Sequence, residues 1–220
     1  EIAEPTDAWG RLAIDVVRAE LERGLVFHEA GEELRELNSI ASPLQDLRDI
    51  FDQMDTESVT GWSDIASRLE RLPVALTQYA QTLSLGRDRG TAVAQRQVVE
   101  AIRQARNHAG DDSHFETFPG VAAEVVDNLL SGRITDGVAS ARMAFGEFAD
   151  FLEKEYLPQA TAADGVGKER YVLHAARFLG AEIDPEETYA WGWSEVEQLR
   201  QRMQEVAGEI LPGSTLAETL

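Results

Sequence analysis

The sequence predicts an all-α protein, a multi-helix, bundle-like domain with no substantial sheet. Apolar residues recur at steps of three and four along most of the 220 residues, and no segment alternates like a strand for more than a few residues. A chain of this length buries roughly 70 % of its unfolded surface. We therefore expect one helical domain over residues 1–220. If it subdivides, the place is residues 157–167, which are rich in Ala, Thr, Gly and Pro.

The clearest helix begins after Asp184. This residue is expected to cap the helix, with Pro185 at the first helical position and Glu187 completing a capping box. The helix ends before Pro212-Gly213. Its apolar residues share one face, which we expect another part of the protein to cover. They are Tyr189, Gly192 or Trp193, Val196, Leu199, Met203, Val206 and Ile210.

The beginning of the chain predicts one long helix and one short one. Thr6 or Asp7 is expected to cap the first helix, and Gly24 is expected to stop it. Residues 32–41 carry apolar side chains at three-residue steps, which indicates a short second helix.

A capping box predicts a third helix over residues 42–54. Ser42 can cap it, Pro43 suits its first position, and Gln45 can return a hydrogen bond to the backbone of the cap.

The middle of the chain predicts a helical hairpin. One helix begins near Trp62 and ends or kinks at Pro73, and its successor runs to Gly86. A further helix over residues 93–109 and a polar loop over residues 110–118 follow.

The pattern after this loop predicts three more helices. Those over residues 121–130 and 136–156 are separated by Ser131-Gly132, and the third runs from about Lys168 to Leu179. Residues 215–218 read as the start of another helix, so we expect the sequence to be the amino-terminal part of a longer protein.

The charge balance excludes some partners. Forty Asp and Glu against twenty Lys and Arg give a formal net charge of −20, which repels nucleic acid and anionic lipid surfaces. We interpret the acidic residues as a solvated surface, with steering of a cationic substrate as the alternative. No apolar run approaches the roughly 18 residues that span a bilayer.

The absence of cysteine excludes disulfides, thiolate zinc sites and cysteine nucleophiles. It is compatible with a reducing compartment, and we expect a cytoplasmic protein. Because the sequence starts at Glu1, a removed signal segment is the alternative.

Histidines supply the candidate metal ligands. His28 and Glu29 resemble half of a zinc-peptidase motif, but the second histidine is missing, so we interpret them and Glu32 as a surface acidic cluster. His108 and His114 flank two aspartates, Asp111 and Asp112, without a recognised ligand spacing, and metal binding there is the minor hypothesis.

His174 is interpreted as a core or boundary residue. Four aspartates at three-residue steps, which are Asp46, Asp49, Asp52 and Asp55, are interpreted as a solvated helix edge.

Trp191 and Trp193 bracket Gly192. We expect this glycine to permit close helix packing, with a ligand or partner surface as the alternative. The sequence contains no phosphate loop, no dinucleotide fingerprint and no GxSxG elbow. We therefore assign no catalytic, cofactor-binding or metal-binding residue to this chain.

Several segments in order resemble the bacterial family known as domain of unknown function 885, particularly its actinobacterial members. The likeness covers most of the chain from about Leu34. It rests on residues 42–54, Trp62, Arg68-Leu69, Pro73, residues 83–90, Arg96-Gln97-Val98, residues 167–171 and residues 184–196.

The resemblance implies a mostly helical protein more than twice this length that looks like a zinc metallopeptidase, with an HExxH helix in its later half. This sequence has no HExxH, so none of its residues inherits a catalytic role. Tyr171 and Glu195 match family-like positions without a role to transfer. Zinc and a peptide substrate are implied for the full-length form only.

Two functions follow as expectations. The first is an amino-terminal helical segment, inactive alone, that supports the downstream half of the same protein and encloses substrate. The second is a non-enzymatic, acidic interaction module that works through its Trp-bearing helix. Because residues 215–218 read as the start of a helix, we also expect an apolar surface that the missing half would normally cover to be exposed and to drive a weak homodimer.

Overall fold

The computed structural model describes residues 7–213 and 215–219. Within these ranges the chain is helical, and its only β-type pairing is an isolated parallel bridge between Ala94 and Thr161. The expected all-α fold is confirmed. The chain divides into two compact units, one of residues 24–165 and one that joins residues up to 23 with residues 166–220. None of the helices in the described ranges has the length and apolar character that a membrane crossing requires.

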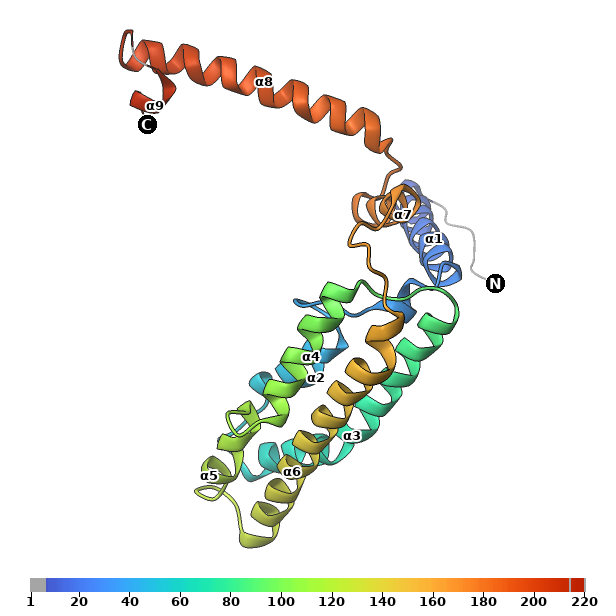
Figure 1. The fold of residues 1–220 in the computed structure, drawn as a ribbon, viewed down its shortest axis with the longest axis vertical. Coiled ribbons are helices and arrows are strands. Elements are labelled where there is room, and N and C mark those ends of the chain that lie inside the picture. Colours follow the sequence, from blue (N-terminus) through green and yellow to red (C-terminus); the bar gives the residue numbers. More distant parts are fainter. Residues whose placement is uncertain (1–6, 214, 220) are drawn as a thin grey trace. The chain divides into compact units, whose positions relative to one another are not determined.

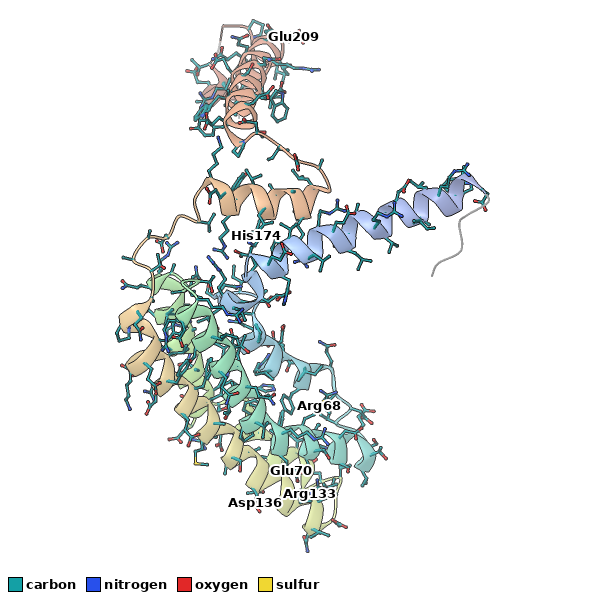
Figure 2. All side chains as sticks on the ribbon, turned by 90° about the vertical axis from the view of Figure 1, so that its right-hand side faces the viewer. Arg68, Glu70, Arg133, Asp136, His174 and Glu209 are labelled. Atoms are coloured by element: carbon teal, nitrogen blue, oxygen red, sulfur yellow. The ribbon has the colours of Figure 1, made fainter. Side chains whose placement is uncertain are left out.

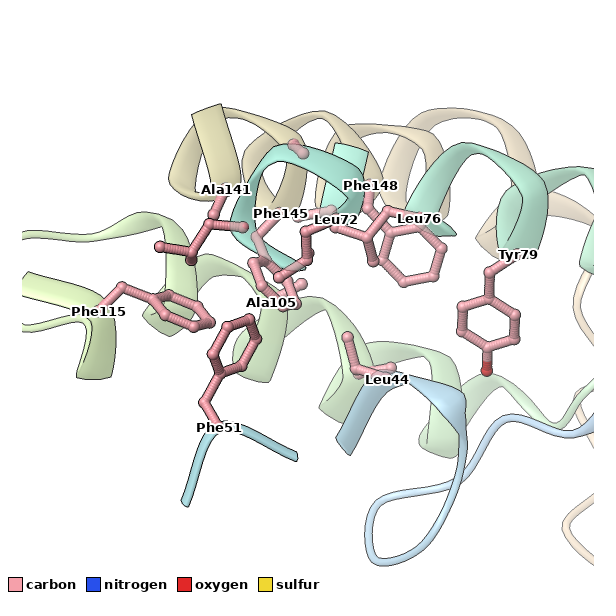
Figure 3. Close-up of a cluster of buried hydrophobic side chains, with 14 of the residues drawn as sticks. Leu44, Phe51, Leu72, Leu76, Tyr79, Ala105, Phe115, Ala141, Phe145 and Phe148 are labelled. Atoms are coloured by element: carbon pink, nitrogen blue, oxygen red, sulfur yellow. The ribbon is translucent and has the colours of Figure 1, made fainter. Parts of the chain in front are cut away.

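The unit of residues 24–165 is a bundle built on three long helices. Figure 1 shows α3 (Val59–Asp88), α4 (Gln95–Ala109) and α6 (Asn128–Phe151) side by side, with α2 (Pro43–Asp49) and α5 (Phe118–Ala122) packed on them. Their buried side chains form one core. Figure 3 shows part of it, including Leu44, Phe51, Leu72, Leu76, Tyr79, Phe115, Phe145 and Phe148.

The predicted hairpin at Pro73 is wrong, because α3 continues through this residue for 30 residues in all. A proline inside a helix costs about 3 kcal/mol through a lost hydrogen bond and a steric clash. The core outweighs this cost, since Leu69, Leu72 and Leu76 are all buried on one continuous face across Pro73.

The predicted break at Ser131-Gly132 is also wrong. Asp127 caps α6 by accepting a hydrogen bond from the Leu130 N–H at 2.9 Å, and the helix then runs through both residues. It continues as a π-helix over Leu152–Tyr156 and a short 3-10 turn over Leu157–Gln159. The predicted helix over residues 121–130 is replaced by α5 and the cap.

The first helix, α1 (Ala8–Glu29), passes the predicted stop at Gly24. Gly24 does not take the left-handed backbone conformation with which a glycine commonly ends a helix, so the helix continues through it. Asp7 accepts a hydrogen bond from the Gly10 N–H at 2.7 Å, as expected of a cap, and Thr6 lies outside the described residues. The short helix predicted over residues 32–41 is only a 3-10 turn over Glu32–Arg35.

The capping box of α2 is confirmed, whereas α8 begins with the predicted Asp184 cap and Pro185 but has no return bond from the Asp184 N–H to the Glu187 side chain among the contacts of the described residues. The Ser42 N–H donates to Gln45 Oε1 at 2.8 Å before α2, which ends at Asp49 and is followed by a 3-10 turn over Ile50–Gln53. Asp184 accepts hydrogen bonds from the Glu186 and Glu187 N–H groups at 2.8 and 3.2 Å.

The other unit contains α7 (Lys168–Leu179), α8 (Pro185–Ile210) and α9 (Leu216–Thr219). The bounds of α7 match the prediction, and Gly180 follows it with a φ of 71°, the left-handed conformation that commonly ends helices. Figure 1 shows α8 as a long uninterrupted helix with α9 folded beside its end.

Candidate functional site

Of the expected surface acidic cluster, His28 and Glu29 lie at the surface and Glu32 does not. His28 lies near the end of α1, with Nδ1 2.6 Å from Glu33 Oε2. Glu29 is exposed, but Glu32 is buried and pairs with Arg35 at 3.6 Å. The interpretation of Glu32 as a surface acid is therefore wrong, because this carboxylate lies inside the protein beside an arginine.

His108 and His114 come together in the bundle, at the end of α4 and in the 3-10 turn His114–Thr117. The predicted polar loop of residues 110–118 is anchored there, because Phe115 is fully buried. The His108 ring centroid lies 4.9 Å from that of Phe145, and the His114 centroid lies 5.2 Å from that of Phe118.

Arg48 of α2 completes this arrangement. Its Nη2 atom is 3.1 Å from His114 Nδ1, while His114 Nε2 is 3.4 Å from Asp52 Oδ1. We call Arg48, Asp52, His108 and His114 the histidine cluster. Burial lowers the pKa of His108 and of His114 below the ordinary value of 6.5, and the positive charge of Arg48 lowers both further.

The histidine cluster is poorly suited to a metal ion. A guanidinium beside His114 repels a cation, and Asp111 turns to Arg142, with which it pairs at 2.7 Å. Throughout residues 7–213 and 215–219, no group of three or more His, Cys, Asp or Glu side chains could hold a metal. The contact of Arg48 with His114 instead joins α2 to the 3-10 turn His114–Thr117.

The four aspartates at three-residue steps have different surroundings. Asp49 pairs with Arg48 at 2.9 Å, Asp52 belongs to the histidine cluster, and Asp46 is exposed. Asp55 accepts a hydrogen bond from the Glu57 N–H at 2.8 Å and one from the Ser58 hydroxyl, and these bonds lower its pKa. The solvated edge predicted from the sequence is thus partly a set of arginine and turn contacts.

His174 lies at the surface of α7, so its interpretation as a core or boundary residue is wrong. Tyr171 on the same helix is also exposed.

The two tryptophans of α8 are exposed by 62 % and 56 % at Trp191 and Trp193. No atom of the described residues lies within 4 Å of a Cβ placed on Gly192, so the close helix packing expected there is absent from the part of the chain that is described. Glu195, on the next turn, is half-buried.

The apolar face of α8 predicted from the sequence is present but open to solvent. We call its seven members the α8 stripe, and each is between 39 % and 68 % exposed. Close to its end, Leu199, Met203 and Ile210 line a groove of about 330 Å³ together with Leu216 of α9. The members of the α8 stripe are Tyr189, Trp193, Val196, Leu199, Met203, Val206 and Ile210.

A second groove lies between α2 with its following 3-10 turn and α3, within the unit of residues 24–165. We call it the α2–α3 groove, and its volume is about 570 Å³. Asp64, Arg68 and Arg71 follow the four- and three-residue steps of one helix face, a signal in the sequence that could have pointed to this groove. Its lining is Leu47, Ile50, Phe51, Met54, Asp64, Ser67, Arg68, Arg71, Leu72 and Ala75.

A comparison with known families identifies a match over almost the whole chain. A family model described as "Bacterial protein of unknown function (DUF885)" matches residues 2–220. No curated protein matches the chain.

Proposed function

The chain belongs to the bacterial family of unknown function DUF885, and from this membership we propose that it is the amino-terminal helical segment of a zinc-peptidase-like protein. In this proposal the segment supports a downstream, metal-bearing half of the same protein and forms a wall of its substrate site. The peptidase character rests on the family resemblance described above.

The α8 stripe is the observation that supports this role best. A surface helix normally buries its apolar face, and covering each of these side chains contributes on the order of 1 kcal/mol. Seven of them lie in order along the 26-residue helix, each more than a third exposed. Such a stripe suits packing against another helical body, which we propose is the downstream half.

The chemistry itself is assigned outside this chain. A catalytic zinc generally takes three protein ligands and a nearby carboxylate base. The residues described here do not fit such a site, because they contain no suitable group of three ligands and Arg48 occupies the space beside His114. We therefore propose no catalytic step for any residue of this chain.

A second candidate is a non-enzymatic, acidic interaction module. The exposure of Trp191 and Trp193 favours it, because aromatic side chains are enriched at protein interfaces and often contribute much of the binding energy. In this case α8 would bind a separate protein.

Reading the natural gene beyond the codon for Leu220 separates the two candidates. An HExxH motif within the next few hundred codons favours the first candidate, the segment that supports a metal-bearing half and encloses substrate. A stop codon directly after Leu220 would refute it and favour the interaction module.

A further inference from the structure

We propose that the α2–α3 groove binds a short apolar peptide with free ends. The peptide carboxylate lies at Arg68 and Arg71, its amino group lies at Asp64, and its side chains rest on Phe51 and Leu72. This deepens the substrate-enclosing role and rests on it for its biological purpose, but the binding itself requires only residues of this chain.

The floor of the groove is apolar. Phe51 and Leu72 are each only 3 % exposed, and Leu47, Ile50 and Met54 are half-buried around them. Ligand sites typically combine an apolar lining with a few placed polar groups, and a volume of about 570 Å³ is within their usual range. The floor therefore suits aliphatic side chains.

The rim carries charges that the protein itself does not neutralise. Within residues 7–213 and 215–219, neither Arg68 nor Arg71 takes part in an ion pair or side-chain hydrogen bond, and the same is true of Asp64. Glu70, which lies between the two arginines in sequence, pairs with Arg133 at 2.9 Å, and Figure 2 labels Arg68, Glu70 and Arg133 on the bundle. Both guanidiniums are exposed at the rim of the groove and open to an anion.

The spacing of these charges indicates the length of the ligand. Asp64 and Arg71 are seven residues apart on α3, which corresponds to roughly 10 Å along the helix axis. An extended peptide of about three residues spans the same length. One end of the groove is therefore matched to a carboxylate and the other to an ammonium group.

Asp64 favours a zwitterionic peptide over an apolar anion without an amino group. A fatty carboxylate would satisfy the arginines but would leave Asp64 without a cation and would gain nothing from it. The Ser67 hydroxyl donates to the Ser63 carbonyl at 2.9 Å, so its oxygen can still accept a hydrogen bond from a peptide N–H. A zwitterionic peptide uses all of these groups.

The test is calorimetric titration of the chain with the tripeptide leucyl-alanyl-leucine, its carboxyl-amidated form, its amino-acetylated form and octanoate. The variants are Arg68→Gln, Arg71→Gln and Asp64→Asn, and circular dichroism checks that each is folded. Arg89→Gln is the matched control, because it makes the same charge change at an exposed position outside the groove.

We expect one-to-one binding of the free tripeptide that weakens about tenfold or more with each arginine variant, as for a lost charged hydrogen bond. Amidation should weaken binding to the unchanged chain but not further weaken binding to the arginine variants. Asp64→Asn should weaken binding of the free peptide and leave binding of the acetylated form unchanged. Arg89→Gln should not change the affinity for any of the peptides.

Three results would overturn the proposal. The first is that no tripeptide binding is detected up to millimolar concentration. The second is that octanoate binds as tightly as the tripeptide and that Asp64→Asn does not change the tripeptide affinity. The third is that Arg68→Gln and Arg89→Gln change the tripeptide affinity equally. Failure of the proposed function alone would look different, since a gene without a metal-bearing half would leave this binding intact.

Discussion

Gly86 of α3 lies directly against the backbone of Leu34, such that a Cβ on Gly86 would be 2.2 Å from the Leu34 carbonyl oxygen. The glycine is buried, and the opposing atom is backbone rather than the end of a flexible side chain. The missing side chain therefore lets the 3-10 turn Glu32–Arg35 pack on the last turns of α3.

Gly86→Ala should lower the free energy of unfolding by about 1–3 kcal/mol, the usual cost of overfilling a packed site. Urea denaturation measures this effect. Gly132→Ala in α6 is the control, because nothing lies within 4 Å of a Cβ there and alanine favours the helix by about 0.5–1 kcal/mol. Equal midpoints for Gly86→Ala and the unchanged chain would contradict the close contact.

The histidine cluster should make stability depend on pH. Burial and Arg48 lower the pKa of His108 and His114 in the folded chain, so the unfolded chain binds protons first as the pH falls. The stabilisation is fully present above the ordinary pKa of 6.5 and is lost as the pH falls from there through the lowered values.

Urea midpoints at about pH 7.5 and about pH 5.5 test this dependence, because these values lie about one unit above and below the ordinary histidine pKa. The double variant His108→Leu, His114→Gln should show a smaller loss between the two pH values than the unchanged chain. Asn107→Ala, at an exposed neighbouring position, should retain the full loss. An identical loss in all three chains would show that the cluster does not titrate as argued.

Isothermal titration with zinc should find no submicromolar one-to-one site in this chain. Arg48 repels a cation at His114, and Asp111 is paired with Arg142. The acidic surface should collect divalent cations only loosely. Tight binding that disappears in a His108→Ala, His114→Ala double variant would overturn this prediction.

The cap of α8 should depend on the charge of Asp184. Hydrogen bonds from the Glu187 and Glu186 N–H groups lower the pKa of this carboxylate, so its stabilisation is present above the ordinary pKa of 3.8 and is lost as the pH falls through the lowered value. Asp184→Ala should speed amide hydrogen exchange in the first turn of α8 at neutral pH. Unchanged exchange of the Glu186 and Glu187 amides would mean that the cap contributes nothing.

The α8 stripe should drive weak self-association. Added salt should strengthen it by screening the repulsion that a net charge of −20 produces. Sedimentation at rising protein concentration is the measurement. Met203→Glu should abolish the association, whereas Arg200→Glu, which also adds negative charge on α8 but outside the stripe, should weaken it less. A strictly monomeric chain at high concentration and moderate salt would refute the prediction.

The sequence predicted the parts of the fold that local chemistry decides. Asp184 and Pro185 defined the start of α8, and Ser42, Pro43 and Gln45 defined that of α2, because caps act within one helical turn. The end of α7 followed from a local signal as well, because Gly180 takes the left-handed conformation directly after Leu179.

Local sequence patterns do not predict the features of this fold that tertiary packing decides. Pro73 and Ser131-Gly132 are local helix breakers, but the core holds α3 and α6 together across them. Asp127 is a typical helix-capping residue, so the start of α6 could have been predicted from the sequence. The meeting of Arg48 with His114, 66 residues apart, and the α2–α3 groove depend on how helices pack, which no local pattern specifies.

Peptide hydrolysis by the natural gene product tests the central claim most directly. A mixed peptide library is digested with the full product, with residues 1–220 alone, and with the full product carrying Met203→Glu in the α8 stripe. We predict zinc-dependent cleavage by the full product, no cleavage by residues 1–220, and reduced cleavage by the Met203→Glu variant. Zinc-dependent cleavage by residues 1–220 alone would contradict the account.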